Sequence, residues 1–207
     1  MSLQAGACPG QSAPIRSVGS QRLVPVRPGL AEDIGRDPHS IVASDPFSMY
    51  FDRSEPATAN GFQAESAALI LDSHLRLLQR PLLPDSPGMA IARRLYHASF
   101  VVLAHDGTPD PVFFYANLCA QQLFEMSWKQ MVGLPSRRSA EPLAQAERRR
   151  LLDRVSQHGW IDDYSGVRVA ASGRRFRIAA ATVWNLLDEA GTVVGQAAAF
   201  ASWQRLD

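Results

Sequence analysis

Three strand-like segments joined by two tight turns constrain the fold of this chain more than any other feature. Residues 162–171 lead into Ser172-Gly173, a pair typical of two-residue β-hairpin turns. The next strand ends at a second turn, 188–191, and a last strand follows at 192–203. Strands joined this closely pair antiparallel, because a parallel connection needs a dozen or more residues. This part of the chain therefore predicts a three-stranded antiparallel meander.

Counting outward from Ser172-Gly173 gives the register of the first hairpin. Val169 faces Phe176 and Val167 faces Ile178, which predicts one coherent apolar face. Arg168 then lies opposite Arg177. Like charges directly across a ladder repel, so this pair favours a carboxylate, an anion or water between them. Arg168 and Arg177 are therefore our candidate contacts for an anion or a partner.

The middle strand is apolar on both faces. Trp184 is assigned to the same face as Phe176 and Ile178, and it is expected opposite Gly195, where a glycine leaves room for the indole. The other face carries Ala181 and Val183. A sheet with one wet face would not show this pattern. We therefore expect the second face to be covered, either by helices predicted at 61–79 and 87–98 or by another subunit.

Composition divides the chain into three parts. Residues 1–60 mix Pro, Gly, Ser and Arg with isolated apolar residues, which is typical of a disordered tail. Apolar residues at helical spacing predict helices within 61–98. Strands at 99–104 and 111–115 follow, then short helices and a longer helix from Pro142 to Gly159. We expect the tail at 1–60, N-terminal helices at 61–98 and one domain at 99–204.

Two strands, short helices, one longer helix and a three-stranded meander follow the order of the PAS fold. More specific matches are LLQRPLLP (77–84), FEMSW (124–128), GLPSRRSAEP (133–142), DDYSGVRV (162–169), GRRFRI (173–178) and ATVWNL (181–186). On these segments the chain resembles the MEKHLA domain family from about Ile70 to Trp203. This PAS-related family occurs as stand-alone bacterial proteins and at the C-terminus of plant homeodomain–leucine zipper factors.

The resemblance implies an α+β fold, with a PAS-like five-stranded antiparallel sheet, helices on one face and N-terminal flanking helices. It also implies a sensory or protein-interaction role, without supplying a ligand. The space between sheet and helices either is a filled core or holds a small apolar or aromatic ligand, with Asn117 or Tyr115 as polar handle. The pocket candidates are Phe100, Phe113, Tyr115, Asn117, Leu123, Trp128, Phe176 and Trp184.

No cofactor or metal is assigned, and haem and flavin stay open as alternatives. Flavin photoreceptors of the LOV type use a cysteine in a later helix and another sequence context, so we interpret Cys119 as a small core residue. Haem-binding PAS domains ligate iron from the long helix. His158, next to Gly159, is more simply explained as a histidine that stabilises the helix end. His97 and His105 lack metal-ligand spacing.

Catalysis and nucleic-acid binding have weaker support. Asp162, Asp163 and Tyr164 resemble acid–base groups, but no nucleophile lies near them, and the aspartates could instead neutralise Arg168 or Arg177. Two basic clusters are explained by a solvated helix face and a hairpin tip, with an anionic ligand or acidic partner as the alternative: Arg148, Arg149, Arg150 and Arg154, and Arg174, Arg175 and Arg177. Nucleic acid has less support, since no aromatic residues interleave with the helix run.

Charge and hydropathy exclude further classes. A net charge of +1 provides no overall field for nucleic acid or an anionic membrane. No window approaches the roughly 18 apolar residues of a membrane span, and the N-terminus has no signal-peptide apolar region. Cys8 and Cys119 are too few for a disulfide framework, so we expect both to be reduced in a cytoplasmic protein.

These observations lead to three hypotheses. The first is a sensor module that binds a small molecule or a protein partner and signals through its sheet or a homodimer interface, without enzymatic activity. The second is a ligand-free homodimerisation or scaffold domain. The third is an enzyme acting on a small aromatic molecule. A cavity distinguishes the first two, and convergent titratable groups inside it would favour the third.

Overall fold

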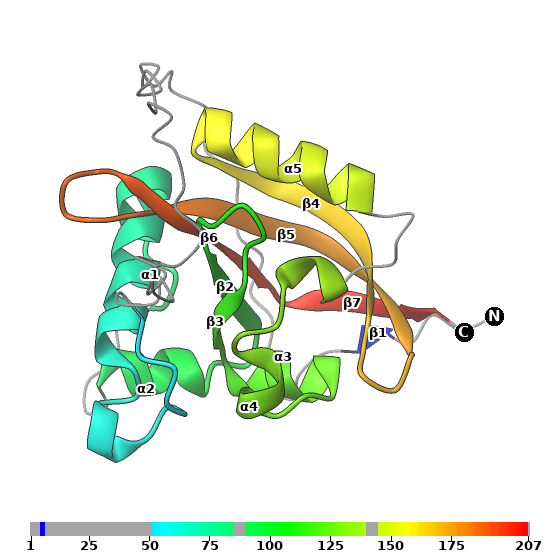
Figure 1. The fold of residues 1–207 in the computed structure, drawn as a ribbon, viewed down its shortest axis with the longest axis horizontal. Coiled ribbons are helices and arrows are strands. Elements are labelled where there is room, and N and C mark those ends of the chain that lie inside the picture. The colour runs from blue at the N-terminus through cyan, green and yellow to red at the C-terminus, as the bar shows by residue number, and fades with distance from the viewer. Residues whose placement is uncertain (1–4, 7–50, 85–89, 140–144, 207) are drawn as a thin grey trace, which may run out of the picture.

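The computed structural model describes residues 5–6, 51–84, 90–139 and 145–206 (Figure 1). The helices are α1 (Ala64–Leu78), α2 (Ile91–Tyr96), α3 (Leu118–Phe124), α4 (Trp128–Met131) and α5 (Gln145–His158), with 3₁₀ turns η2 (Thr58–Asn60) and η3 (Ser136–Ser139). The strands are β1 (Ala5–Gly6), β2 (Val101–Asp106), β3 (Phe113–Ala116), β4 (Trp160–Val169), β5 (Arg175–Leu187), β6 (Val193–Phe200) and β7 (Ser202–Leu206).

The strands form one antiparallel sheet. Its five main strands lie side by side in the order β3, β2, β6, β5, β4. This arrangement confirms the predicted five-stranded antiparallel sheet and the α+β class. The predicted last strand is divided at Ala201: β6 pairs with β2 and the second half of β5, and β7 pairs with the first half of β5. β1 pairs with β7.

The first hairpin turns through three residues, not the predicted two. The Ala170 amide donates to the Arg174 carbonyl at 2.8 Å, so residues 171–173 form the loop. Gly173 has φ 85°, the left-handed conformation that three-residue hairpin loops use. A loop one residue longer moves every pair in the ladder by one position.

The register of that hairpin therefore differs from the prediction. Arg168 pairs with Phe176, and Val167 pairs with Arg177. Because successive side chains point to opposite faces, Arg168 and Arg177 lie on different sides of the sheet. The predicted pairs Val169–Phe176, Val167–Ile178 and Arg168–Arg177 are wrong.

A bulge in β5 reverses which residues face which side. Ala180 has φ 51°, and the pairing of β5 changes from β7 to β6 on either side of it. An extra residue of this kind shifts the alternation of side chains. Phe176 and Ile178 consequently belong to one core cluster and Trp184 to the other, so their assignment to one face is wrong.

The second turn also has a different register. Leu186 pairs with Gly195, and Trp184 pairs with Ala197, so the predicted Trp184–Gly195 pair is wrong. The glycine serves another contact: a Cβ at Gly195 would clash with the carbonyl oxygen of His105 on β2. It allows β6 and β2 to approach closely.

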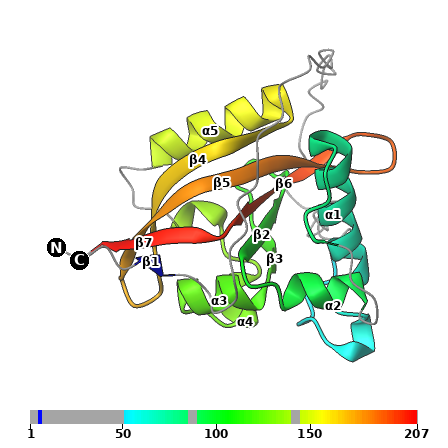
Figure 2. The same cartoon turned by 180° about the vertical axis from the view of Figure 1, so that it is seen from behind.

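The sheet carries a hydrophobic core on each face. One core includes residues of α3, α5 and the inner faces of β4 and β5; the other joins the sheet to α1 and α2. Figures 1 and 2 show α1 and α5 against different parts of the sheet. Three polar contacts fasten α1: Trp184 Nε1 donates to the Ile70 carbonyl (3.2 Å), the Leu187 amide to Ser73 Oγ (2.9 Å), and Arg76 to the Asp188 carbonyl (3.0 Å). Both faces of the sheet are covered, as expected, but α1 and α2 lie on the face of Trp184, so the expectation that the N-terminal helices cover the face of Ala181 and Val183 is wrong.

The described N-terminal part starts before the predicted domain. Phe51 stacks on Phe114 with ring centroids 3.7 Å apart, and Trp128 Nε1 donates to the Arg53 carbonyl at 2.9 Å. Phe51 and Arg53 thus contact the domain, so the predicted tail boundary at residue 60 is too late. Ala5 and Gly6 form β1, and the rest of that prediction, residues 1–4 and 7–50, lies outside the described residues. No helix in the described ranges is long and apolar enough to cross a membrane.

Cys119 does not carry the expected free thiol. The described part of the chain contains no free cysteine, and Cys119 is disulfide-bonded. The expectation of a reduced thiol at Cys119 is therefore wrong. Cys8 lies outside the described residues.

Candidate ligand cavity

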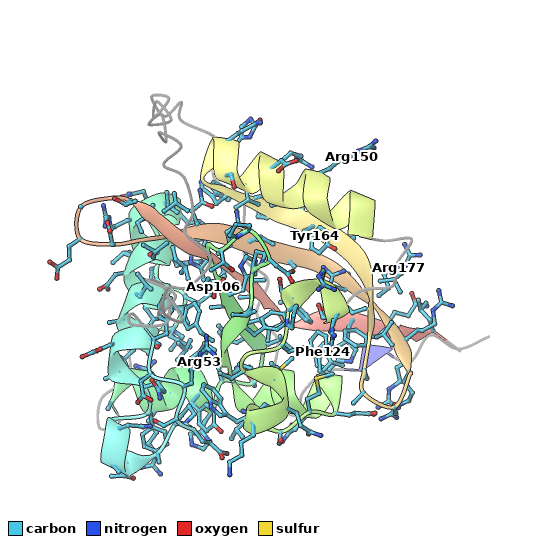
Figure 3. All side chains as sticks on the ribbon, viewed as in Figure 1. Arg53, Asp106, Phe124, Arg150, Tyr164 and Arg177 are labelled. Carbon is cyan, nitrogen blue, oxygen red and sulfur yellow. The ribbon has the colours of Figure 1, made fainter. Side chains whose placement is uncertain are left out.

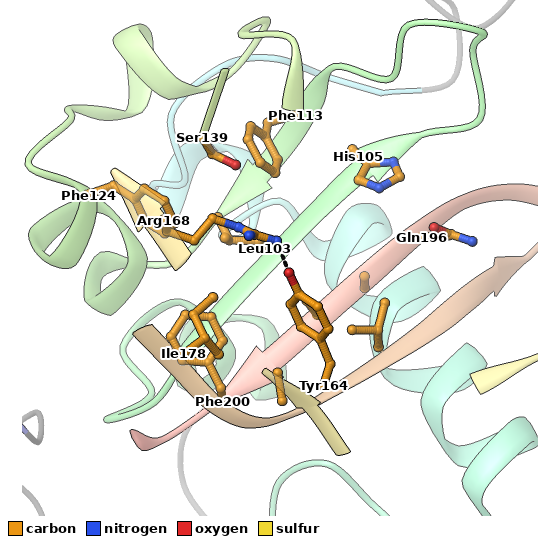
Figure 4. A pocket seen from close by; sticks show the side chains of 14 residues that line it. Leu103, His105, Phe113, Phe124, Ser139, Tyr164, Arg168, Ile178, Gln196 and Phe200 are labelled. Carbon is orange, nitrogen blue, oxygen red and sulfur yellow. Dashed lines mark hydrogen bonds between the residues drawn. The ribbon is translucent and has the colours of Figure 1, made fainter. Parts of the chain in front are cut away.

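A cavity of about 60 Å³ lies between the sheet and the helices that follow β3 (Figure 4). Its walls come from β2, β3, α3, η3, β4, β5 and β6. The apolar lining residues are Leu103, Phe113, Phe124, Ile178, Ala181, Val183, Ala197, Ala198 and Phe200. The polar lining residues are His105, Ser139, Tyr164, Arg168 and Gln196.

Tyr164, Gly166 and Arg168 alternate along β4 and so share its inward face. The Arg168 guanidinium donates from Nη2 to Tyr164 Oη (2.7 Å) and from Nη1 to the Val167 carbonyl (2.9 Å). Its central carbon lies 5.3 Å from the centroid of the Tyr164 ring. Figure 4 shows the two side chains pointing toward each other across the cavity.

Gly166 is necessary for this arrangement. A Cβ on Gly166 would clash with the Tyr164 hydroxyl and approach Arg168 Nη1 to 3.3 Å. The absence of a side chain at this position therefore lets the phenol and the guanidinium fold over the strand. The pattern Tyr-x-Gly-x-Arg is visible in the sequence, but Val167 and Val169 favoured the opposite face in the prediction.

The eight predicted pocket residues do not gather at one place. Phe113 lines the cavity. Phe176 and Leu123 pack in the same core without lining it. The other core, on the α1 side, contains Phe100, Tyr115, Trp128 and Trp184. The bulge at Ala180 explains the position of Trp184.

Asn117 and Tyr115 do not serve as polar handles in this cavity. Asn117 caps α3 by accepting from the Ala120 amide (3.0 Å), and it also accepts from the Val102 amide (3.0 Å) and donates to the Phe100 carbonyl (2.7 Å). Its side chain is thus used to join β2 to α3. The Tyr115 hydroxyl is buried on the other face without a hydrogen-bond partner in the described structure, and burial raises its pKa.

The two predicted arginine contacts have different environments. Arg168 is 8% exposed and lines the cavity, whereas Arg177 is exposed on the opposite face of β5. Figure 3 shows Arg177 beside the sheet and Arg150 on the outward side of α5. Asp162 and Asp163 are exposed and form no salt bridge in the described ranges, so neither neutralises Arg168 there.

Haem and flavin do not fit the cavity. Pockets for organic ligands of that size span about 300–1,000 Å³, several times the 60 Å³ found here. His158 is exposed at the end of α5, where its Nδ1 lies 2.9 Å from the Arg154 carbonyl, away from the cavity lining. Among the described residues no three His, Cys, Asp or Glu side chains form a metal-binding group.

The element order and the five antiparallel strands define a PAS-like α+β domain, and a comparison of sequences places it more narrowly. The MEKHLA domain family matches residues 64–205, well over half of the 207 residues. The chain belongs to this family. A comparison with curated proteins gave no match.

Solved structures similar to this chain are PAS and LOV domains. A PAS domain from Colwellia psychrerythraea is 15% identical and covers 52% of this chain and 89% of its own, with a TM-score of 0.47. The LOV domain of the blue-light photoreceptor Aureochrome1 is 18% identical over 58% and 87%, with a TM-score of 0.42. The photo-excited photoreceptor Vivid is 15% identical over 67% and 94%, with a TM-score of 0.44. The fold assignment rests on the strand order and the family match.

Proposed function

We propose that this chain is a sensory module whose internal cavity binds a small molecule and whose sheet passes the bound state on to a partner or a second copy of the chain. The observation that carries this proposal is the cavity with Arg168 and Tyr164 on its wall. A core selected only for stability would be filled with apolar side chains at this place.

The polar groups of the cavity support binding over catalysis. Ser139 donates its proton to the Ser136 carbonyl (2.7 Å), and Tyr164 accepts from Arg168. Neither hydroxyl is hydrogen-bonded to a general base in the described structure, as an activated nucleophile would be. The geometry therefore favours a receptor over an enzyme.

β5 provides a short route from the cavity to α1. Val183 lines the cavity, and its neighbour Trp184 points to the other face and donates to the Ile70 carbonyl. A ligand that moves this part of β5 would change the packing of α1. α1 in turn carries Leu75, which is 49% exposed, so a change in the packing of α1 would reach the surface of the domain.

Native mass spectrometry of freshly purified full-length protein, with an absorption spectrum of the same sample, tests the proposal. We expect a bound small-molecule mass that is lost when the cavity-lining Ala181 is replaced in Ala181→Phe. Ala190→Phe, in the exposed turn after β5, should keep the ligand.

A bare polypeptide mass, together with no change in melting temperature across a small-molecule library, would contradict ligand binding. A dimer in the same spectrum would then favour the ligand-free homodimerisation or scaffold role.

A further inference from the structure

Arg168 is a buried cation that has no carboxylate partner among the described residues. Its side chain belongs to a residue that is 8% exposed, and neither of the salt bridges found in the described ranges involves it. A guanidinium has five N–H groups. Two of them donate, to Tyr164 Oη and to the Val167 carbonyl. Burying a charge is costly unless it is paired, so the remaining donors favour an anion.

Tyr164 offers a second donor at the same place. Its oxygen accepts the bond from Arg168 Nη2, so the phenolic proton remains available to another acceptor. Both side chains line the cavity (Figure 4). The fork of a guanidinium matches the two oxygens of a carboxylate, and charge-assisted bonds of this kind are the strong ones.

The rest of the cavity limits what accompanies the carboxylate. Ile178, Ala181 and Phe200 give it apolar walls, and its volume of about 60 Å³ admits only a few heavy atoms. A short aliphatic tail fits these walls, and the described lining contains no second arginine or lysine that would pair with another anionic group, since its other polar residues are His105, Ser139 and Gln196.

We propose that the cavity binds a small monocarboxylate, with its carboxylate on Arg168 and Tyr164 and its short aliphatic end against Ile178 and Phe200. This inference rests on the proposed function and names the chemical class of the ligand. Arg177, the other arginine predicted to contact an anion, lies on the other face of the sheet and takes no part in this site.

The test is a ¹H–¹⁵N NMR titration of the full chain in a carboxylate-free buffer at constant ionic strength. The probes are acetate and propionate, each compared with its neutral amide, acetamide and propionamide. We expect saturable shifts with at least one acid and binding of the matched amide at least tenfold weaker.

Matched variants locate the binding site. Arg168→Met removes the charge and should weaken acid binding at least tenfold, and Arg168→Lys should restore only part of it because the planar fork is lost. Tyr164→Phe removes one donor and should have a smaller effect. Arg177→Met, an exposed arginine on the next strand, should bind like the wild type.

The outcomes separate the two proposals. If an amide binds as tightly as its acid, or Arg168→Met binds as tightly as the wild type, the carboxylate inference is wrong while the cavity remains a ligand site. If neither acid binds, the inference is also wrong, and the native mass spectrum alone then decides the proposed function.

Discussion

Arg168 occupies an interior position that a residue of its type rarely takes without a charged partner. Its hydrogen bonds to Tyr164 and to the Val167 carbonyl satisfy only part of its donors. Taking a charge out of water costs several kcal/mol unless its partners compensate it. We therefore expect the buried charge of Arg168 to lower the free energy of unfolding.

Arg168→Met should leave the free energy of unfolding unchanged or raise it by up to about 3 kcal/mol, because a desolvated charge is replaced by an apolar chain of similar length. Urea denaturation at neutral pH measures it. Arg177→Met is the control and should stay within about 0.5 kcal/mol of the wild type, as exposed positions usually do. A loss above about 2 kcal/mol for Arg168→Met would show that the guanidinium stabilises the fold.

His74 predicts a specific pH dependence of stability. It is 3% exposed, and burial lowers its pKa from 6.5 to about 4. Between pH 6.5 and 4, His74 is therefore mostly protonated in the unfolded chain and mostly neutral in the folded chain. This contribution to stability is fully present above pH 6.5 and falls as the pH drops toward 4.

At 1.36 kcal/mol per pKa unit, His74 should lower the stability by about 2 kcal/mol at pH 5 relative to pH 7.5. His74→Phe keeps a ring against Trp184 and should remove this part of the pH dependence. Equal pH slopes in the wild type and His74→Phe, measured by urea denaturation at both values, would show that His74 is not the group responsible.

At the scale of elements, the bulge in β5 decides which side chains reach the cavity. Ala180 has φ 51°, a conformation that strains a residue with a Cβ and suits glycine. Ala180→Gly should therefore raise the free energy of unfolding by about 0.5–1 kcal/mol. In a regular strand the same change would lower it by a similar amount, so the sign of the change tests the bulge.

The sequence predicted the elements well and their detailed pairing poorly. Strand and helix positions follow from hydrophobic period and turn residues, which are local signals. The register of the first hairpin depends on whether its loop has two or three residues. The face of Trp184 depends on a bulge at Ala180, and the sequence has no glycine there that would indicate a bulge.

For the cavity, the sequence indicated Phe113, whereas Arg168 was proposed as an anion or partner contact opposite Arg177 and not as a cavity residue. Tyr164 was noted only as an acid–base candidate. Tyr164 and Arg168 meet because they point to the same face of β4 with Gly166 between them. The prediction instead turned Val167 and Val169 toward the core, which placed Tyr164 and Arg168 on the wrong face.

At the scale of the whole molecule, Trp184 connects the sheet to the helical layer. It is fully buried, donates to the Ile70 carbonyl (3.2 Å) and meets the His74 ring edge-on with centroids 5.0 Å apart. Trp184→Ala should lower the free energy of unfolding by about 3–5 kcal/mol, because it leaves a large cavity between the layers.

Leu75→Ala, on the same helix but 49% exposed, provides the matched control and should lose about 1 kcal/mol or less. A Trp184→Ala loss as small as that of Leu75→Ala would mean that α1 does not pack on the sheet as described.

The proposed ligand meets Arg168 inside the domain. The most direct measurement is a ¹⁵N-arginine side-chain NMR spectrum of the full chain with and without propionate, in which the Arg168 Nε–H signal is identified by its absence in Arg168→Met. This signal should shift with propionate and stay unmoved by propionamide, while the Arg177 signal stays in place. An Arg168 signal that propionate leaves unchanged would show that Arg168 does not bind the carboxylate.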